Sequence, residues 1–337
     1  MVQGLYSLEE VKAMILKGDS LLLAGDAALL ADLPKGKWIA GAVSRFIEKG
    51  KTLVTSREKI FVHNVTDVAS DITLKVYETK TVHSIYEDAF ENGFSVLIVP
   101  YMSEILNEYA VKCTSYVHFG TRVVCGWVAL APIFSEYERN DESLVFSGET
   151  GMSYTNALVV MHVALPAEKY AEVYAFSPFK PDEGDKIIFE EDGQQIENVL
   201  INGKRQNFRQ YFIDRKIDRS NTACNMLAGI HSTGLIMNVG IHEDTETDQG
   251  KYVSIGAPVY KGIPYCLAKA DAETSYRNIK KFDDEIVFSL SCITNYVCPE
   301  IFLEHTDANG PFAYGEIAYF LLNHATVYLT VGNITKK

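Results

Sequence analysis

Apolar and polar positions in the first half of the chain predict short helices alternating with buried strands. Apolar residues recur at helical spacing after the capping signature Ser7-Leu-Glu-Glu10 and stop at Gly18, which predicts a first helix. Further helices are predicted over 26–33, 84–92 and 103–116. Apolar runs predict strands over 21–23, 38–43, 59–63, 72–77, 94–99 and 122–130. This alternation indicates sheets covered by helices.

The second half is predicted to be richer in strands, because β-branched and apolar runs are separated by turn signals such as Asp192-Gly193. These runs are 156–165, 186–191, 196–201, 252–267, 286–292, 312–318 and 325–331. Helices are predicted over 207–216 and 297–305, and no short internal repeat is visible. We therefore predict an α+β fold of two intimately packed lobes, 1–180 and 181–337, with mixed, largely buried sheets covered by helices.

Composition limits the partners. The chain has 337 residues, 47% of them hydrophobic, and a formal net charge of -13, so nucleic acid and anionic membranes are not expected to bind it. No stretch reaches the roughly 18 apolar residues of a membrane span, and no signal peptide is visible, so a cytoplasmic location is predicted. The six cysteines lack metal-site spacing and are expected to be reduced thiols.

The end of the chain carries the candidate site. Glu316 follows Tyr314-Gly315 on an apolar strand, where a carboxylate is costly unless it is paired or faces water. Glu316 either binds an ammonium or hydroxyl group of a ligand or accepts bonds from neighbouring backbone. Tyr314 is a second candidate ligand-binding residue on this strand. Asn323 either orients a ligand or caps a turn through its own backbone.

Three more side chains are candidate ligand-binding residues. His324 opens the last strand as a ligand donor, a haem ligand or a solvated residue, and the solvated reading is favoured. Cys292 is read mainly as a small buried hydrophobe, because no cation stands beside it to activate the thiol. Arg45 follows a strand and is placed to clamp a carboxylate, although a surface position is commoner.

Two other motifs lack the residue spacing that a metal site or a nucleotide-binding loop requires. His231 and His242 stand in a repeated Gly-Ile-His, but their spacing fixes no metal geometry, so no metal is expected. Ser147-Gly-Glu-Thr-Gly-Met-Ser153 precedes a strand and lacks a terminal lysine, which excludes a nucleotide loop and leaves it as a possible pocket lining. No catalytic signature is present, and a non-enzymatic protein is favoured.

Several motifs of the second half occur in the order found in a known family. Val199-Leu-Ile-Asn-Gly-Lys-Arg-Gln206 precedes an aromatic helix over 208–212, and the apolar strand 287–292 ends in Ser-Cys. Phe312-Ala-Tyr-Gly-Glu-Ile317 and Asn323-His-Ala-Thr326 follow. In this order they resemble the C-terminal domain of the FIST family of bacterial sensory proteins.

The remaining comparison with the FIST family is looser. Leu33-Pro-Lys-Gly-Lys-Trp-Ile-Ala-Gly41 is similar to FIST-like N-terminal regions. Two features depart from the family: Ile293-Thr-Asn295 stands where an arginine often follows the Ser-Cys strand, and the Asn-x-Thr motif is one residue longer. The chain therefore looks like a divergent branch with its own ligand.

The resemblance implies a bacterial sensory domain for signal transduction that binds a small molecule, such as an amino acid or related metabolite, and does not catalyse a reaction. It implies transfer of the signal to a separate protein, with a homo-oligomer as one route. No cofactor is expected in this reading. The first alternative is a haem-bearing gas sensor that uses His324, His162 or His118 as axial ligand. The second is an enzyme of unknown class with a pocket around Glu316, using Cys292 or His324.

Overall fold

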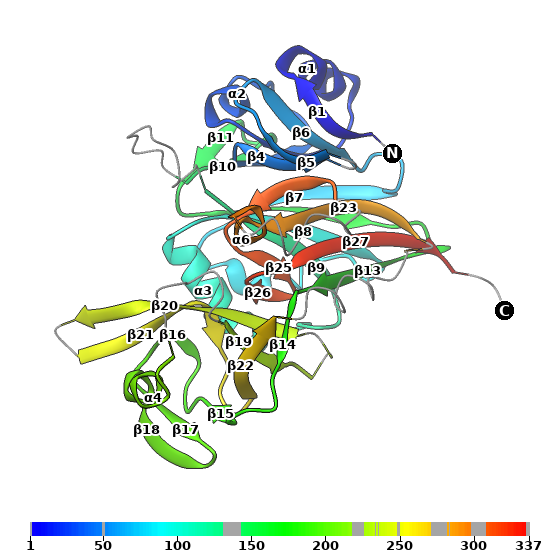
Figure 1. The fold of residues 1–337 in the computed structure, drawn as a ribbon. Coiled ribbons are helices and arrows are strands. Elements are labelled where there is room, and N and C mark those ends of the chain that lie inside the picture. Colours follow the sequence, from blue (N-terminus) through cyan, green and yellow to red (C-terminus); the bar gives the residue numbers. More distant parts are fainter. Residues whose placement is uncertain are drawn as a thin grey trace.

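The structure of the chain is a computed structural model (Figure 1). It describes residues 2–48, 51–130, 143–217, 226–232, 234, 236–247, 250–270, 282, 284–297 and 308–334. In this part of the chain the strands form three six-stranded sheets and one nine-stranded sheet. Strands and a few helices occur together, and three of the sheets mix parallel and antiparallel pairs, so the predicted α+β fold is confirmed.

The first sheet lies at the N-terminal end of the molecule and has helices on one face (Figure 1). In spatial order its strands are β1 (Gln3–Ser7), β6 (Lys59–Asn64), β2 (Leu21–Gly25), β3 (Trp38–Ala42), β10 (Val145–Ser147) and β11 (Met152–Tyr154). Alternate residues of β2 face opposite ways: Leu21 and Leu23 pack with the helices, whereas Leu22 joins the central core. Helices α1 (Leu8–Lys17) and α2 (Ala27–Ala31) supply the covering layer.

The predicted capping signals form as expected. The backbone N–H of Ser7 donates to the Glu10 carboxylate at 2.8 Å, and Gly18 ends α1 in the left-handed region. The Ser103 hydroxyl caps α3 (Glu104–Lys112) by accepting from the backbone of Leu106 at 3.2 Å. The caps therefore fix where each helix leaves the preceding strand.

The second and third sheets form the middle of the molecule. The second contains β7 (Asp71–Tyr77), β12 (Leu158–Ala164), β8 (Gly93–Pro100), β9 (Val123–Ala129), β25 (Glu316–Ala318) and β26 (Phe320–Leu322). The third contains β13 (Lys169–Phe176), β27 (Thr326–Asn333), β23 (Glu285–Cys292), β24 (Gly310–Ala313), β4 (Arg45–Glu48) and β5 (Lys51–Thr55). Short helices accompany them: η1 (Val82–Ser84), η2 (Cys113–Ser115) and α6 (Ile293–Val297).

These three sheets share one strand order and one pattern of strand directions. In each sheet an outer strand pairs antiparallel with a second, the second pairs antiparallel with a third, and the third pairs in parallel with a fourth. Those four strands come from one stretch of chain: 3–64, 71–164 or 169–333. The chain therefore contains three topologically equivalent modules, a repeat that the sequence analysis missed.

Each module contributes a hairpin to the sheet of another module. The β10–β11 hairpin of the second module completes the first sheet, β25–β26 of the third completes the second, and β4–β5 of the first completes the third. The exchange closes a ring, so every sheet needs strands from two modules. The repeat is hidden in the sequence because equivalent strands share burial and direction but not residue identity.

The fourth sheet is an insertion between β13 and β23 and lies at the opposite end of the molecule from the first sheet (Figure 1). Its strands are β14 (Phe179–Pro181), β15 (Ile187–Ile188), β16 (Gly193–Ile196), β17 (Asn198–Ile201), β18 (Lys204–Asn207), β19 (Met226–Ile230), β20 (Ile236–Thr247), β21 (Gly250–Val259) and β22 (Pro264–Ala270), with helix α4 (Phe208–Asp214). The sheets do not follow the predicted division near residue 180. The insertion begins there, but strands from residue 285 onward return to the ring, because they complete its second and third sheets.

Three predicted elements differ from the structure. The predicted helix over 84–92 is only the turn η1 followed by irregular backbone, because side chains tie it to the second sheet: Tyr86 donates to the Tyr319 carbonyl at 2.7 Å.

The predicted strand 252–267 turns at Gly262 into β21 and β22. The predicted strand 312–318 is broken at Tyr314–Gly315, where the chain leaves the third sheet for the second. Most of the predicted helix 297–305 lies outside the described residues.

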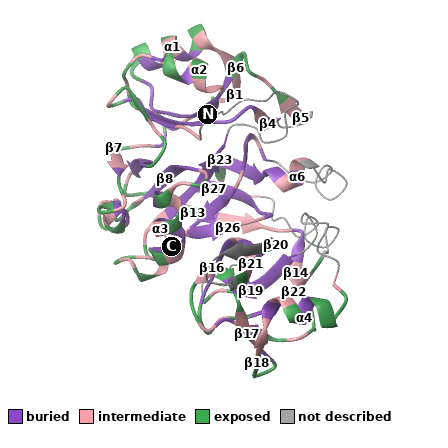
Figure 2. Cartoon of the chain, turned by 90° about the vertical axis from the view of Figure 1, so that its left-hand side faces the viewer, coloured by how far each residue is buried: buried purple, intermediate pink, exposed green. Residues whose placement is uncertain are grey.

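Aromatic side chains from the three modules contact one another where the modules meet. Adjacent rings run from Phe46 through Phe61, His63 and Phe288 to Trp127, with centroid separations of 5.8, 5.0, 4.8 and 5.4 Å. They come from β4, β6, β23 and β9, and therefore from all three modules. The strands that carry them are largely buried (Figure 2). Aromatic contacts of this kind add stability beyond the apolar area that they bury.

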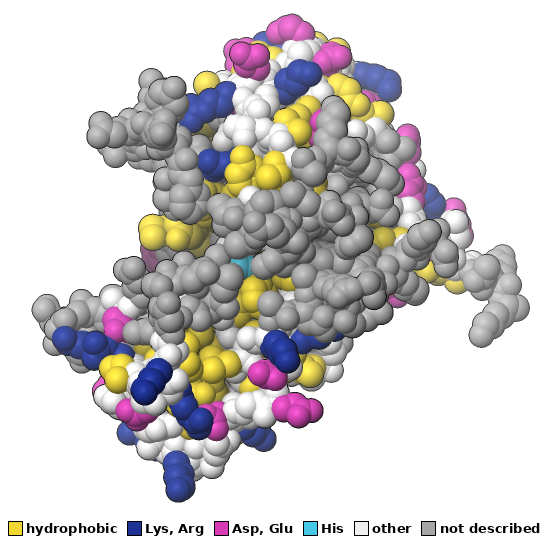
Figure 3. All heavy atoms as spheres, in the orientation of Figure 1, with side chains coloured by type: hydrophobic (Ala, Val, Ile, Leu, Met, Phe, Trp, Pro, Cys, Tyr) yellow, Lys and Arg dark blue, Asp and Glu magenta, His cyan; other side chains and the backbone are white. Residues whose placement is uncertain are grey.

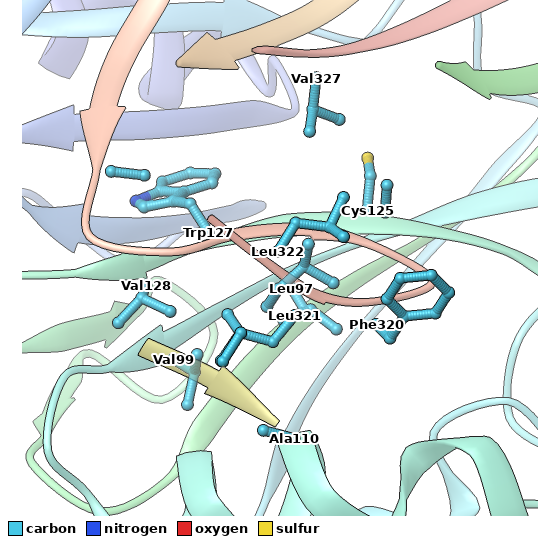
Figure 4. Close-up of a cluster of buried hydrophobic side chains, with 14 of the residues drawn as sticks. Leu97, Val99, Ala110, Cys125, Trp127, Val128, Phe320, Leu321, Leu322 and Val327 are labelled. Atoms are coloured by element: carbon cyan, nitrogen blue, oxygen red, sulfur yellow. The ribbon is translucent and has the colours of Figure 1, made fainter. Parts of the chain in front are cut away.

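The exchanged β25–β26 hairpin is held by its apolar side chains. Phe320, Leu321 and Leu322 belong to the same buried cluster as Leu97 of β8 and Val128 of β9 (Figure 4). Full burial of a leucine or phenylalanine contributes about 1.5–3 kcal/mol. The hairpin is therefore an integral part of the core of the second sheet.

Two glycines allow the parallel strands to pair closely. A methyl group on Gly126 of β9 would lie 1.9 Å from the Leu97 carbonyl oxygen, and one on Gly310 of β24 would lie 1.9 Å from the Ser289 carbonyl oxygen. We expect Gly126→Ala and Gly310→Ala each to lower the free energy of unfolding by roughly 3 kcal/mol, because the strands must separate. Gly184→Ala, which meets nothing within 4 Å, is the matched control. Urea unfolding measures all three, and a neutral Gly126→Ala would contradict the observed strand spacing.

Candidate functional site

A cavity of about 970 Å³ lies where the second and third modules meet the inserted sheet. Tyr101 and Val128 line it at the carboxyl ends of the parallel strands β8 and β9, and Cys292 and Tyr314 line it at the ends of β23 and β24. In open α/β sheets ligands bind at this edge of the strands. The inserted sheet forms the opposite wall through β16, β20 and β21. Because the repeat brings two such edges together, the cavity is the candidate binding site.

The structure brings four of the six predicted ligand-binding residues to this cavity: Cys292, Tyr314, Asn323 and His324. Glu316 is fully buried and lies behind Cys292 instead of in the lining. Arg45 is not a lining residue, because β4 carries it into the third sheet, where its guanidinium lies 5.2 Å from the centre of the Tyr296 ring. The structure therefore does not place Arg45 where it could clamp a ligand in this cavity.

Asn323 and His324 lie in the connection between the exchanged hairpin and β27. The Asn323 backbone N–H donates to the Asn238 carbonyl at 3.1 Å, and its side-chain oxygen accepts from the Gly240 N–H at 3.2 Å. The connection is thereby tied to β20 of the inserted sheet. The favoured prediction of a solvated His324 is wrong: the residue is only 4% exposed, because its ring packs edge-on against Phe179.

A chain of polar side chains leads from the cavity wall into the core. The Thr294 hydroxyl donates to the Cys292 sulfur at 2.9 Å and lies 2.9 Å from Nδ1 of His324. On the far side of Cys292 lies the Glu316 carboxyl, whose Oε2 accepts from the Ala325 backbone at 3.1 Å. Its Oε1 is buried without a hydrogen-bond partner in the described structure. Glu316 thus takes a backbone bond, as one of the two sequence readings proposed.

Burial sets the protonation of these groups. It raises the pKa of Glu316 well above its usual range, and burial together with the nearby Glu316 raises the pKa of Cys292. Burial, with a smaller effect of nearby His242, lowers the pKa of His324 to about 3. At neutral pH Cys292 is therefore a thiol and His324 a neutral imidazole, and Glu316 is shifted towards its protonated form. A protonated thiol beside a weakly basic imidazole is a poor nucleophile.

Two residues of the cavity lining, His242 and Met102, are not among the predicted ligand-binding residues. His242 was weighed only as a metal ligand, but it lines the cavity from β20, whereas His231 packs against Phe119 and Phe320 elsewhere. Met102 at the cavity edge is 83% exposed and has a φ of 54°. The repeated Gly-Ile-His was the only sequence signal for His242, and Met102 had none, because both positions depend on how distant strands meet.

The other histidines named as haem ligands lie away from the cavity. His162 is enclosed in β12, with its ring nitrogens 2.7 Å from the Ser95 hydroxyl and 2.8 Å from the Tyr77 hydroxyl. His118 is an exposed residue in a turn. In the described residues, no group of three or more His, Cys, Asp or Glu is arranged to hold a metal ion. Of the three predicted axial ligands, His324 alone lines the cavity.

Comparison with known families adds one assignment. A model of the family of unknown function DUF6976 matches residues 6–332. The chain belongs to this family. The DUF6976 match begins in β1 and ends in β27, so it takes in all three modules and the inserted sheet. No curated protein matches the chain.

Three further observations describe the helices, the surface charge and the cysteines of the DUF6976 chain. No helix in the described ranges has both the length and the apolar character needed to cross a membrane. On the face shown in Figure 3, basic and acidic side chains are interspersed at both ends, without a continuous basic patch among the coloured atoms. Four cysteines, Cys113, Cys125, Cys266 and Cys292, are free thiols in the structure, and Cys224 and Cys298 lie outside the described residues.

The buried acid predicts a specific pH dependence. Because the pKa of Glu316 is higher in the folded chain than in the unfolded chain, its contribution to stability is present below about pH 4.5 and is lost as the pH rises. Glu316→Gln removes this loss. We expect the difference in unfolding free energy, variant minus parent, to grow by up to about 1.4 kcal/mol per pH unit from about pH 5 towards pH 8. Chemical denaturation across this range measures it, and parallel pH profiles would show that Glu316 is ionised in the folded chain.

Proposed function

We propose that the protein binds a small molecule in the cavity between the ring and the inserted sheet and acts as a sensory protein of the FIST type. The observation that carries this proposal is the cavity itself, which lies at the carboxyl ends of two parallel strand pairs and is lined by four residues from the FIST-like motifs. Its volume of about 970 Å³ is in the range of small-molecule sites.

The lining combines apolar surface with a few polar groups. Leu106, Val111 and Ile255 are among its apolar residues, while Asn323 and His242 supply hydrogen-bonding groups. Small-molecule sites have this composition, because apolar contacts supply affinity and a few polar groups fix orientation. The mixed wall therefore supports binding of a compact organic ligand.

Backbone strain supports the same site. Met102 and His324 have φ values of 54° and 52°, and both line the cavity. A residue other than glycine pays a conformational penalty in this region, and such residues gather at functional sites. The Thr294 hydroxyl and the Phe179 ring contact His324 and help to hold it in this conformation.

The protonation states favour binding over catalysis. Thr294 bridges the Cys292 thiol and the His324 imidazole, but the lowered pKa of His324 makes it too weak a base to remove the proton of a thiol whose own pKa is raised. A ligand in the cavity would instead touch both the inserted sheet and the closed ring of three modules. Its binding would shift the balance between arrangements of the two, and this shift would be the signal read by a separate protein.

A ligand screen tests the proposal. We expect at least one metabolite in a broad panel to raise the melting temperature, because binding to the folded chain alone stabilises it. Asn107→Trp, on an exposed lining position of α3, should weaken this effect by filling the cavity mouth. Glu104→Trp, exposed on the same helix but outside the lining, is the control. A panel without any stabilising compound, or equal shifts in both variants, would contradict binding in this cavity.

A further inference from the structure

We propose that the ligand of this cavity is an uncharged molecule that carries an amide group, either a carboxamide or a cyclic amide, bound between the side chains of Asn323 and His324. This inference rests on the proposed function and narrows it. It follows from which hydrogen-bonding atoms of the two side chains are already used inside the protein and which ones are left for a ligand.

Asn323 supplies a donor. Its Oδ1 accepts the N–H of Gly240, so the amide orientation is fixed by a backbone donor and Nδ2 is the remaining polar atom. Among the described residues nothing accepts a hydrogen bond from this Nδ2. Gly256 lies against the oxygen end of this amide, because a methyl group there would lie 2.6 Å from Oδ1 of Asn323 and 3.0 Å from Nε2 of His242. The Asn323 amide and the His242 ring therefore border the same small space.

His324 supplies an acceptor. The Thr294 hydroxyl has one proton and donates it to the Cys292 sulfur, so it can only accept from Nδ1–H of His324. A neutral imidazole with its proton on Nδ1 has an unprotonated Nε2. No described residue donates to this Nε2. The buried chain from Cys292 through Thr294 thus selects the tautomer that His324 offers to the cavity.

One donor and one acceptor, both on side chains that line the cavity, match the two ends of an amide group. The carbonyl oxygen of the ligand would accept from Asn323, and its N–H would donate to His324. A site built to bond such a group rejects analogues that leave its buried polar atoms unpaired. The pattern therefore selects for a ligand that is both donor and acceptor.

A carboxylate or phosphate fits this wall less well. The described lining residues include no Lys or Arg, and Asp192 is their one charged side chain. Arg45, the predicted clamp, lies over Tyr296 in the third sheet. An anionic group would enter without a counter-ion and against the net charge of -13, which makes its desolvation costly. The α-carboxylate of a free amino acid meets the same obstacle.

Matched pairs of probes test the inference. Nicotinamide and nicotinate, and benzamide and benzoate, differ in an amide against a carboxylate at nearly constant shape. We expect titration calorimetry of the full chain to give at least tenfold tighter binding of each amide than of its acid, since the acid lacks the N–H and carries a charge. Equal or tighter binding of the acids, or no binding of either amide, would overturn the inference.

Variants of the two side chains locate the effect. Thr294→Val removes the hydroxyl that fixes the His324 tautomer, and Asn323→Asp replaces the donor while keeping an oxygen for Gly240. Each should weaken amide binding about tenfold. Thr294→Ser retains the hydroxyl and should bind as the parent does.

Nitrogen NMR of the histidines adds a readout that does not depend on any ligand. The signals that are absent from the spectrum of His324→Gln belong to His324 in the parent. Their chemical shifts in the parent should be those of a neutral ring protonated on Nδ1. A ring protonated on Nε2 would contradict the inference even if amides bind. If another class of compound binds in the cavity, this inference fails and the proposed function stands; if no compound in a broad panel binds there, the proposed function fails as well.

Discussion

The exchange of hairpins between modules is the constraint on which the rest of the structure depends. No six-stranded sheet can form from one module, because two of its strands arrive from another stretch of chain. The step at Tyr314–Gly315 is one such exchange: β24 ends in the third sheet and β25 begins in the second. Residues far apart in sequence must therefore meet before any sheet is complete, and the aromatic rings from Phe46 to Trp127 fill the space where they meet.

The same exchange builds the candidate site. It carries the β25–β26 hairpin against the inserted sheet, so the following connection presents Asn323 and His324 to the cavity. It also buries Glu316 behind Cys292, where the carboxyl has a backbone donor but forms no ion pair with any described residue. The protonation states that favour binding over catalysis are therefore consequences of the fold, since burial is the largest cause of each pKa shift. The insertion supplies the second wall of the cavity through β16, β20 and β21.

Local features of the fold could be predicted from sequence, and long-range ones could not. The capping box at Ser7 and the buried runs of β8 and β23 depend on neighbouring residues and were predicted close to their observed positions. In the sequence, the segment 312–318 predicts one continuous strand, because the residues on both sides of the break at Tyr314–Gly315 are equally apolar. Four of the six candidate residues reached the cavity since they lie close to one another at the chain end, whereas Arg45 was misplaced because its strand is exchanged into another sheet. His242 depends on the register of β20 and β21, which contains an irregularity that sequence does not reveal.

The closed ring can be tested with the two tryptophans that the chain contains. Trp38 lies in the first sheet and Trp127 in the second, and both are buried. Variants that keep one of them, Trp127→Phe and Trp38→Phe, each report the unfolding of one sheet by fluorescence. Because the sheets share strands, each variant should show the same midpoint of denaturation by its remaining tryptophan and by circular dichroism of the whole chain. A Trp38 signal that is lost at clearly lower denaturant than the circular dichroism signal would show that the first sheet unfolds by itself, and would contradict the closed ring.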